Sequence, residues 1–106
     1  MSYNEIDPRE AKDLIDQGTS LYLLDVREQH EYDAAHIEGV TLIPLGQLED
    51  KLTALDKNLS ILCICAGGIR SARAADRLVT EGFTDVTNMK EGMNGWQARN
   101  FPVLKS

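Results

Sequence analysis

The stretch of sequence that decides the fold runs from Ser60 to Ser71 and reads SILCICAGGIRS. Its first six residues, 60–65, form a short apolar run, which is the pattern of a β-strand covered on both faces. The pair Gly67-Gly68 then interrupts the run, and apolar residues return at helical spacing, at Ala74, Ala75, Leu78 and Val79. The stretch therefore predicts a buried strand, a tight glycine loop and a helix that closes at Gly82.

The segments on either side repeat this alternation of strand and helix. Asp7 and Glu10 flank Pro8 in the arrangement of a capped helix start, which predicts a helix over 8–17. Further expected elements are a strand at 21–26, a short helix at 28–35, a strand at 39–43, a helix at 45–55, a strand at 86–88 and a helix after Gly92 that carries Trp96. This order predicts an α/β fold in which a central parallel sheet has helices on both faces, with residues 1–106 as one domain.

The composition and net charge of the chain argue against some classes of binding partner. The chain has 106 residues, 42% of them hydrophobic, and a formal net charge of −6, so its average surface repels nucleic acid and anionic lipid. Neither a membrane span nor a signal peptide is visible, and we expect a cytoplasmic protein. His30 and His36 lack the companion ligands of a metal site, so we expect surface or turn roles for both, with no metal and no cofactor.

The segment from Cys65 to Ser71 lies between the predicted strand and the predicted helix, where open α/β sheets place their functional sites. Its loop residues are Ala66, Gly67, Gly68, Ile69, Arg70 and Ser71. Glycines let several backbone N–H groups point inward, and the helix N-terminus adds partial positive charge. A cysteine is a nucleophile only as the thiolate, so these N–H groups and Arg70 predict a lowered pKa for Cys65.

Several residues have structural alternatives. Cys65 would be an inert core thiol if the loop did not present it, whereas Cys63, inside the strand, is interpreted as structural. Asp25 and Arg27 form either an ion-pair network with Glu31 or a support for the cysteine loop. Arg73 and Arg77 are expected on a solvated charged face with Asp76 and Glu81, and Trp96 is expected in the core or in a lid.

Three segments resemble the signatures of rhodanese domains. The first is the loop itself, in which four residues separate Cys65 from Arg70. The second is DVREQHEY at 25–32, which continues to HIEG at 36–39 and to Ile43-Pro44. The third is GMNGW at 92–96, and together they span nearly the whole chain. The chain departs from the family pattern at Ala66, where many members have a basic residue, and at Ala35 and Glu91, where glycines are usual.

The resemblance implies a rhodanese-like fold and a sulfurtransferase or persulfide carrier in which Cys65 holds sulfane sulfur as a persulfide. It implies a small donor such as thiosulfate or a persulfide, a thiol or cyanide as acceptor, and the option of a protein as donor or acceptor. Because Ala66 brings no charge to the loop, thiosulfate is the less favoured natural donor.

Two alternatives stand beside this interpretation. Cysteine-dependent phosphatases and arsenate reductases also pair a cysteine with an arginine, but the phosphatase loop is one residue longer and commonly has a histidine where this chain has Ile64. A non-catalytic or partner-dependent regulatory module is the other alternative. Such modules usually lose the cysteine, so its presence favours chemistry.

Overall fold

The computed structural model describes residues 2–106. The strands are β1 (Asn4–Ile6), β2 (Tyr22–Asp25), β3 (Thr41–Leu42), β4 (Ser60–Ile64) and β5 (Asp85–Met89). The helices are α1 (Pro8–Asp16), α2 (Gln29–Ala34), α3 (Leu45–Lys51), α4 (Ile69–Thr80) and α5 (Gly92–Ala98), with a 3-10 turn at Leu52–Ala54. None of the helices within 2–106 has the length and apolar character needed to span a membrane.

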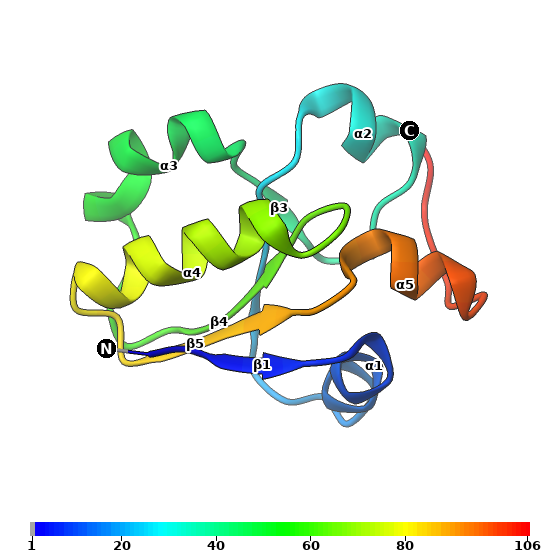
Figure 1. Cartoon of the computed structure of the whole chain (residues 1–106), viewed down its shortest axis with the longest axis horizontal. Coiled ribbons are helices and arrows are strands. Elements are labelled where there is room, and N and C mark those ends of the chain that lie inside the picture. The colour runs from blue at the N-terminus through cyan, green and yellow to red at the C-terminus, as the bar shows by residue number, and fades with distance from the viewer. Residues whose placement is uncertain (1) are drawn as a thin grey trace.

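The five strands form one sheet in the order β1-β5-β4-β2-β3, and every neighbouring pair is parallel. Helices α1 and α5 pack together at one face of the sheet, and α3 and α4 pack together at the other. Figure 1 shows α3 and α4 on one side of the strands and α1 on the other. The predicted α/β fold with helices on both faces is therefore confirmed.

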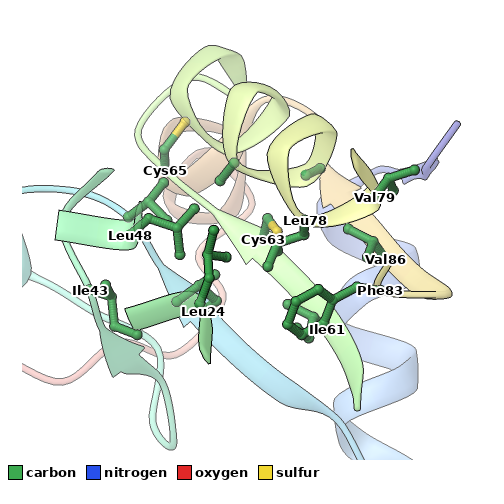
Figure 2. Close-up of a cluster of buried hydrophobic side chains, with 14 residues drawn as sticks. Leu24, Ile43, Leu48, Ile61, Cys63, Cys65, Leu78, Val79, Phe83 and Val86 are labelled. Atoms are coloured by element: carbon green, nitrogen blue, oxygen red, sulfur yellow. The ribbon is translucent and has the colours of Figure 1, made fainter. Parts of the chain in front are cut away.

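Side chains of β4 alternate between two hydrophobic clusters. Ile61 and Cys63 belong to the cluster beneath α3 and α4, together with Leu24 and Leu78. Figure 2 shows this cluster, with Cys63 and Cys65 on the same side of β4. Leu62 and Ile64 instead belong to the opposite cluster, and the other members there are Ala11, Leu23, Ile37, Met89, Met93 and Trp96. Burial on both faces explains why β4 is the most uniformly apolar strand.

Local sequence signals fix several element ends. Asp7 accepts a hydrogen bond from the Glu10 N–H and Glu10 accepts one from the Asp7 N–H, so the predicted capping box of α1 is present. The helix expected at 45–55 is shorter than predicted because its last residues tighten into the 3-10 turn. The strand expected at 39–43 is reduced to Thr41 and Leu42, since Pro44 stands two residues after Leu42 and Gly39 has a left-handed φ of 89°.

All-parallel order brings the carboxyl ends of β2, β4 and β5 to one edge of the sheet. The loop 65–68 leaves this edge between β4 and α4, and α2 and α5 begin at the same edge. Residues far apart in the sequence therefore meet around Cys65.

Candidate functional site

The sulfur of Cys65 lies in a small cradle formed by the loop that follows β4. The Gly68 N–H donates a hydrogen bond to it at 3.1 Å, and the Ser71 hydroxyl donates another at 3.2 Å. Gly68 adopts a φ of 94°, in the left-handed region that favours glycine. This conformation turns its N–H toward the sulfur, and Ser71 is fully buried in the first turn of α4.

The cradle favours the thiolate of Cys65. Burial raises the pKa of this thiol, but hydrogen bonds from the Ser71 hydroxyl and from the N–H groups of Ser71, Gly68 and Gly67 outweigh burial and hold the pKa below its usual value. The predicted direction is confirmed. Donors that stabilise negative charge on sulfur can equally hold a persulfide anion or a small oxyanion.

Cys63 lies in the opposite environment, although only one residue separates it from Cys65. It is fully buried inside β4, and burial raises the pKa of its thiol to about 12. A thiol with such a pKa stays protonated near neutrality and is a poor nucleophile. Both cysteines are free thiols.

The start of α5 anchors the cysteine loop from outside. The Met93 N–H donates to the carbonyl of Cys65 at 2.8 Å, and the Asn94 N–H donates to the carbonyl of Ala66 at 2.9 Å. The backbones approach so closely that a side chain at Gly92 would lie about 2.6 Å from the Ala66 carbonyl oxygen. The glycine is therefore required by packing, and the motif at 92–96 serves the loop through its backbone.

Arg70, expected to favour the thiolate together with the loop N–H groups, has its side chain bound to a carboxylate and makes no hydrogen bond to the sulfur. Its guanidinium donates two hydrogen bonds to the carboxylate of Glu31 in α2, at 2.7 and 2.8 Å, and donates none to Cys65. The Arg70 hydrogen bond lowers the pKa of Glu31 to about 2, and the same pair raises the pKa of Arg70. The planar donor fork of a guanidinium matches a carboxylate well, so Arg70 can act on Cys65 only through its charge at longer range.

Asp25 and Arg27 form a buried ion pair just after β2. Their side chains are almost fully buried, and two Arg27 nitrogens donate to the Asp25 carboxylate. The guanidinium also donates to the backbone carbonyls of Glu31 within α2 and of Ala35 at its C-cap, so the pair holds this helix against the end of β2. The expected network with Glu31 is present. Arg27 donates to the backbone carbonyl of Glu31, whereas the Glu31 carboxylate accepts hydrogen bonds from Arg70.

Asn88 on β5 is a buried polar residue that sequence reasoning missed. Its side-chain N–H₂ group donates to the carbonyl of Gly68 and to the carboxylate of Glu5. This links two strands to the residue whose N–H meets the sulfur. Its side-chain oxygen has no partner among the described residues, and nothing in the structure explains that oxygen. In the sequence the amide stands between Thr87 and Met89 in a strand of mixed polarity, so no local signal marked it as buried.

A groove of about 280 Å³ opens beside the cysteine loop. Its walls combine small or apolar residues (Ala34, Ala35, Ala66 and Met93) with polar ones (Arg27, Glu31, Asn94, Gln97 and Lys105). Ile69 lies next to the loop and is 72% exposed, an unusual position for a large apolar side chain. The groove beside the cradle therefore has small and apolar groups on part of its wall and polar groups of both charges on the rest.

The other candidates have structural positions. His36 is buried and stacks on Tyr32 with a ring-centroid separation of 3.8 Å. Of the expected surface or turn roles it has the second, because it lies in the connection after α2 and pairs with the Leu104 backbone. His30 is exposed. Trp96 is a core residue, and its ring N–H donates to the Pro102 carbonyl.

The charged face of α4 and the family departures have local explanations. Arg77 pairs with Glu81 as expected and also with Glu49 of α3. Ala35 has extended backbone, which needs no glycine, whereas Glu91 adopts a left-handed φ of 64° and pairs with Arg99. Within residues 2–106, no three potential metal-binding side chains gather in one place.

Fold and cradle together define a class of α/β domains that present a cysteine at the carboxyl end of a central parallel strand. The model of the rhodanese-like domain matches residues 7–99, so the chain belongs to the rhodanese family.

Named relatives agree with this assignment. The Bacillus subtilis protein named "Putative sulfur carrier protein YrkF" is 42% identical over 98 residues, which cover 92% of this chain and 53% of YrkF. The chain thus spans about half of that longer relative. The B. subtilis protein named "Putative sulfurtransferase YtwF" is 33% identical over 102 residues, which cover 96% of this chain and 98% of YtwF.

Solved structures show the same fold. The crystal structure of a rhodanese-like domain protein from Staphylococcus aureus superposes with a TM-score of 0.82 at 31% identity, covering 88% of this chain and 90% of that one. Family and relatives together support a role in sulfur transfer.

Proposed function

We propose that residues 1–106 act as one rhodanese domain that carries sulfane sulfur on Cys65 as a persulfide. The observation that carries this proposal is the pair of hydrogen bonds from Gly68 and Ser71 to the Cys65 sulfur, which favour an anionic sulfur there. The names of the relatives, sulfur carrier and sulfurtransferase, describe the same chemistry in those proteins.

The reaction has two steps. In the first, the Cys65 thiolate attacks the outer sulfur of a donor, a sulfur–sulfur bond forms at Cys65, and the donor's own sulfur–sulfur bond breaks with its electron pair on the leaving group. In the second, an acceptor thiolate or cyanide attacks the outer sulfur of the persulfide and restores the Cys65 thiolate. Loop N–H groups stabilise negative charge on sulfur in both steps.

Phosphate chemistry is less well supported. Arg70, the residue that would clamp a phosphoryl group, has its donors bound to Glu31, and the loop is one residue shorter than a phosphatase loop. We expect negligible hydrolysis of aryl phosphates. A robust phosphatase rate that depends on Cys65 would overturn the assignment to sulfur.

Intact-mass analysis tests the persulfide directly. The protein is incubated with thiosulfate or with glutathione persulfide, and a gain of one sulfur atom is expected in the wild type and in Cys63→Ala. Cys65→Ser should gain none, since an alcohol at this position has no nucleophilic thiolate. Loading that survives Cys65→Ser and disappears in Cys63→Ala would show that the wrong cysteine has been assigned, and a protein that no donor loads would be a non-catalytic module.

A further inference from the structure

The arginines nearest to the proposed site are already neutralised by partners within the fold. Arg27 is paired with Asp25 and is buried, so its charge is balanced inside the turn after β2. Arg70 is held by both oxygens of Glu31, whose carboxyl group stays ionised because its pKa is about 2. An incoming anion is therefore attracted only weakly by either arginine, because the paired carboxylate of each repels the anion.

The loop brings no charge of its own to the entrance. Between Cys65 and Ile69 the chain has only Ala66 and two glycines, and no side chain there is larger than a methyl group. Ile69 adds an exposed apolar surface beside them. Of the described residues that line the groove, Lys105 is the one cation without an ion pair, and it lies exposed near the end of the chain. The cradle thus offers backbone N–H groups to one sulfur but little charge to a larger anion.

Two classes of donor place different demands on such an entrance. Thiosulfate brings two negative charges to a thiolate that already has one, and it leaves as sulfite with both charges. A thiol persulfide with an uncharged R group brings at most one: in its protonated form, R–S–SH, the thiolate attacks the outer sulfur, the proton stays on the transferred sulfur, and R–S⁻ leaves with the electron pair. The first reaction needs cations around the sulfur, whereas the second does not.

We propose that Ala66 and the Arg70–Glu31 pair make the site selective for thiol persulfides over thiosulfate. The proposal rests on the proposed function, since it names the donor of the same Cys65 reaction. The net charge of −6 acts in the same direction, because it disfavours the approach of a dianion to any part of the surface.

Loading rates of Cys65 with the persulfide of 2-mercaptoethanol, whose R group has no charge, and with thiosulfate test the selectivity. We expect the second-order rate constant for the persulfide to exceed that for thiosulfate by at least about tenfold at low ionic strength. Added potassium chloride should narrow the gap, because salt screens the repulsion between the protein and the dianion. Equal or faster loading by thiosulfate at low salt would overturn the selectivity and leave the persulfide function intact, whereas no loading by either donor would contradict the function itself.

A positive charge introduced beside Cys65 should change the ratio of the loading rate with thiosulfate to that with the persulfide. Ala66→Lys is expected to raise loading by thiosulfate relative to loading by the persulfide, and Ala66→Gln, of similar length without the charge, is expected to leave the ratio low. Glu31→Gln provides a second variant, because it releases the guanidinium of Arg70 from its carboxylate. If neither Ala66→Lys nor Glu31→Gln shifts the ratio toward thiosulfate, charge at the entrance does not set the donor.

Discussion

At the scale of single residues, the reactivity of Cys65 depends most on two hydrogen-bond donors to its sulfur. The Ser71 hydroxyl and the Gly68 N–H both reach Cys65, while Arg70, the only charged group in the loop, is turned away toward Glu31. Neutral donors at hydrogen-bond distance therefore act on the sulfur more directly than the full charge does. The loop sequence predicts a joint contribution from N–H groups and Arg70, and in the structure only the neutral donors form hydrogen bonds with the sulfur.

Ser71→Ala should raise the pKa of Cys65, because it removes the donor that contributes most to the lowering of that pKa. Alkylation by iodoacetamide near neutral pH should slow several-fold, and the pH profile of the rate should shift upward. Cys63 does not interfere, since its pKa is about 12.

Arg70→Ala is the matched comparison for Ser71→Ala. Its effect on the alkylation profile should be smaller, because the guanidinium acts on Cys65 only at longer range. If Arg70→Ala shifts the profile further than Ser71→Ala does, the charge of Arg70, and not the neutral donors, is the main cause of the lowered pKa of Cys65.

At the scale of secondary-structure elements, the Glu31–Arg70 pair joins α2 to the start of α4. Glu31 has a folded-state pKa of about 2 against an ordinary value of 4.5, so its contribution to stability is complete above about pH 4.5 and is lost as the pH falls toward 2. That lowering corresponds to about 3 kcal/mol before solvent screening. We expect about 1 kcal/mol, because the two side chains are 24% and 35% exposed.

Glu31→Gln should therefore cost about 1 kcal/mol of unfolding free energy near neutral pH and almost nothing at about pH 2. Urea unfolding of the wild type and the variant at both pH values measures the difference. A cost that stays the same at both pH values would mean that Glu31 acts through its shape in the α2 cap rather than through its charge.

The elements that the sequence predicted are those whose periodicity comes from burial. Ile61, Leu62 and Ile64 are apolar because both faces of β4 are covered, and α4 follows for the same reason. The edge strand β1 escaped prediction because Asn4 and Glu5 are exposed and polar, so the strand exists through backbone pairing with β5.

Most contacts of the site join residues that are far apart in the sequence, so they could not be predicted before the fold was known. Cys65 and its loop were recognisable because they are contiguous in the sequence. Glu31 lies 39 positions from Arg70, and only the parallel sheet order brings α2 beside α4. Asn88 reaches Gly68 across 20 positions by the same route. Burial of His36 depends on the backbone of Leu104, which local sequence does not reveal.

At the scale of the whole molecule, two hydrophobic clusters share one sheet. Leu78 belongs to the cluster under α3 and α4, and Met89 belongs to the cluster under α1 and α5, and both side chains are fully buried. Because β4 and β5 contribute to both clusters, neither can lose its packing while the other keeps the sheet intact. The domain should unfold as one cooperative unit.

Leu78→Ala and Met89→Ala should each lower the unfolding free energy by about 2 to 5 kcal/mol. Fluorescence of Trp96, which lies in the cluster across the sheet from Leu78, and circular dichroism should report the same midpoint in each variant. Separate midpoints for the two signals in Leu78→Ala would show that the faces of the sheet unfold independently.

The hydrogen bonds between α5 and the cysteine loop have a consequence for how long sulfur stays on Cys65. With the carbonyls of Cys65 and Ala66 tied to the Met93 and Asn94 amides, the peptide planes of the loop have no freedom to rotate. The loop is thus preorganised, and it need not change conformation when Cys65 accepts a sulfur atom. With such a loop, the lifetime of a sulfur held on Cys65 would depend on how often an acceptor thiol reaches the site, rather than on a change in the shape of the loop.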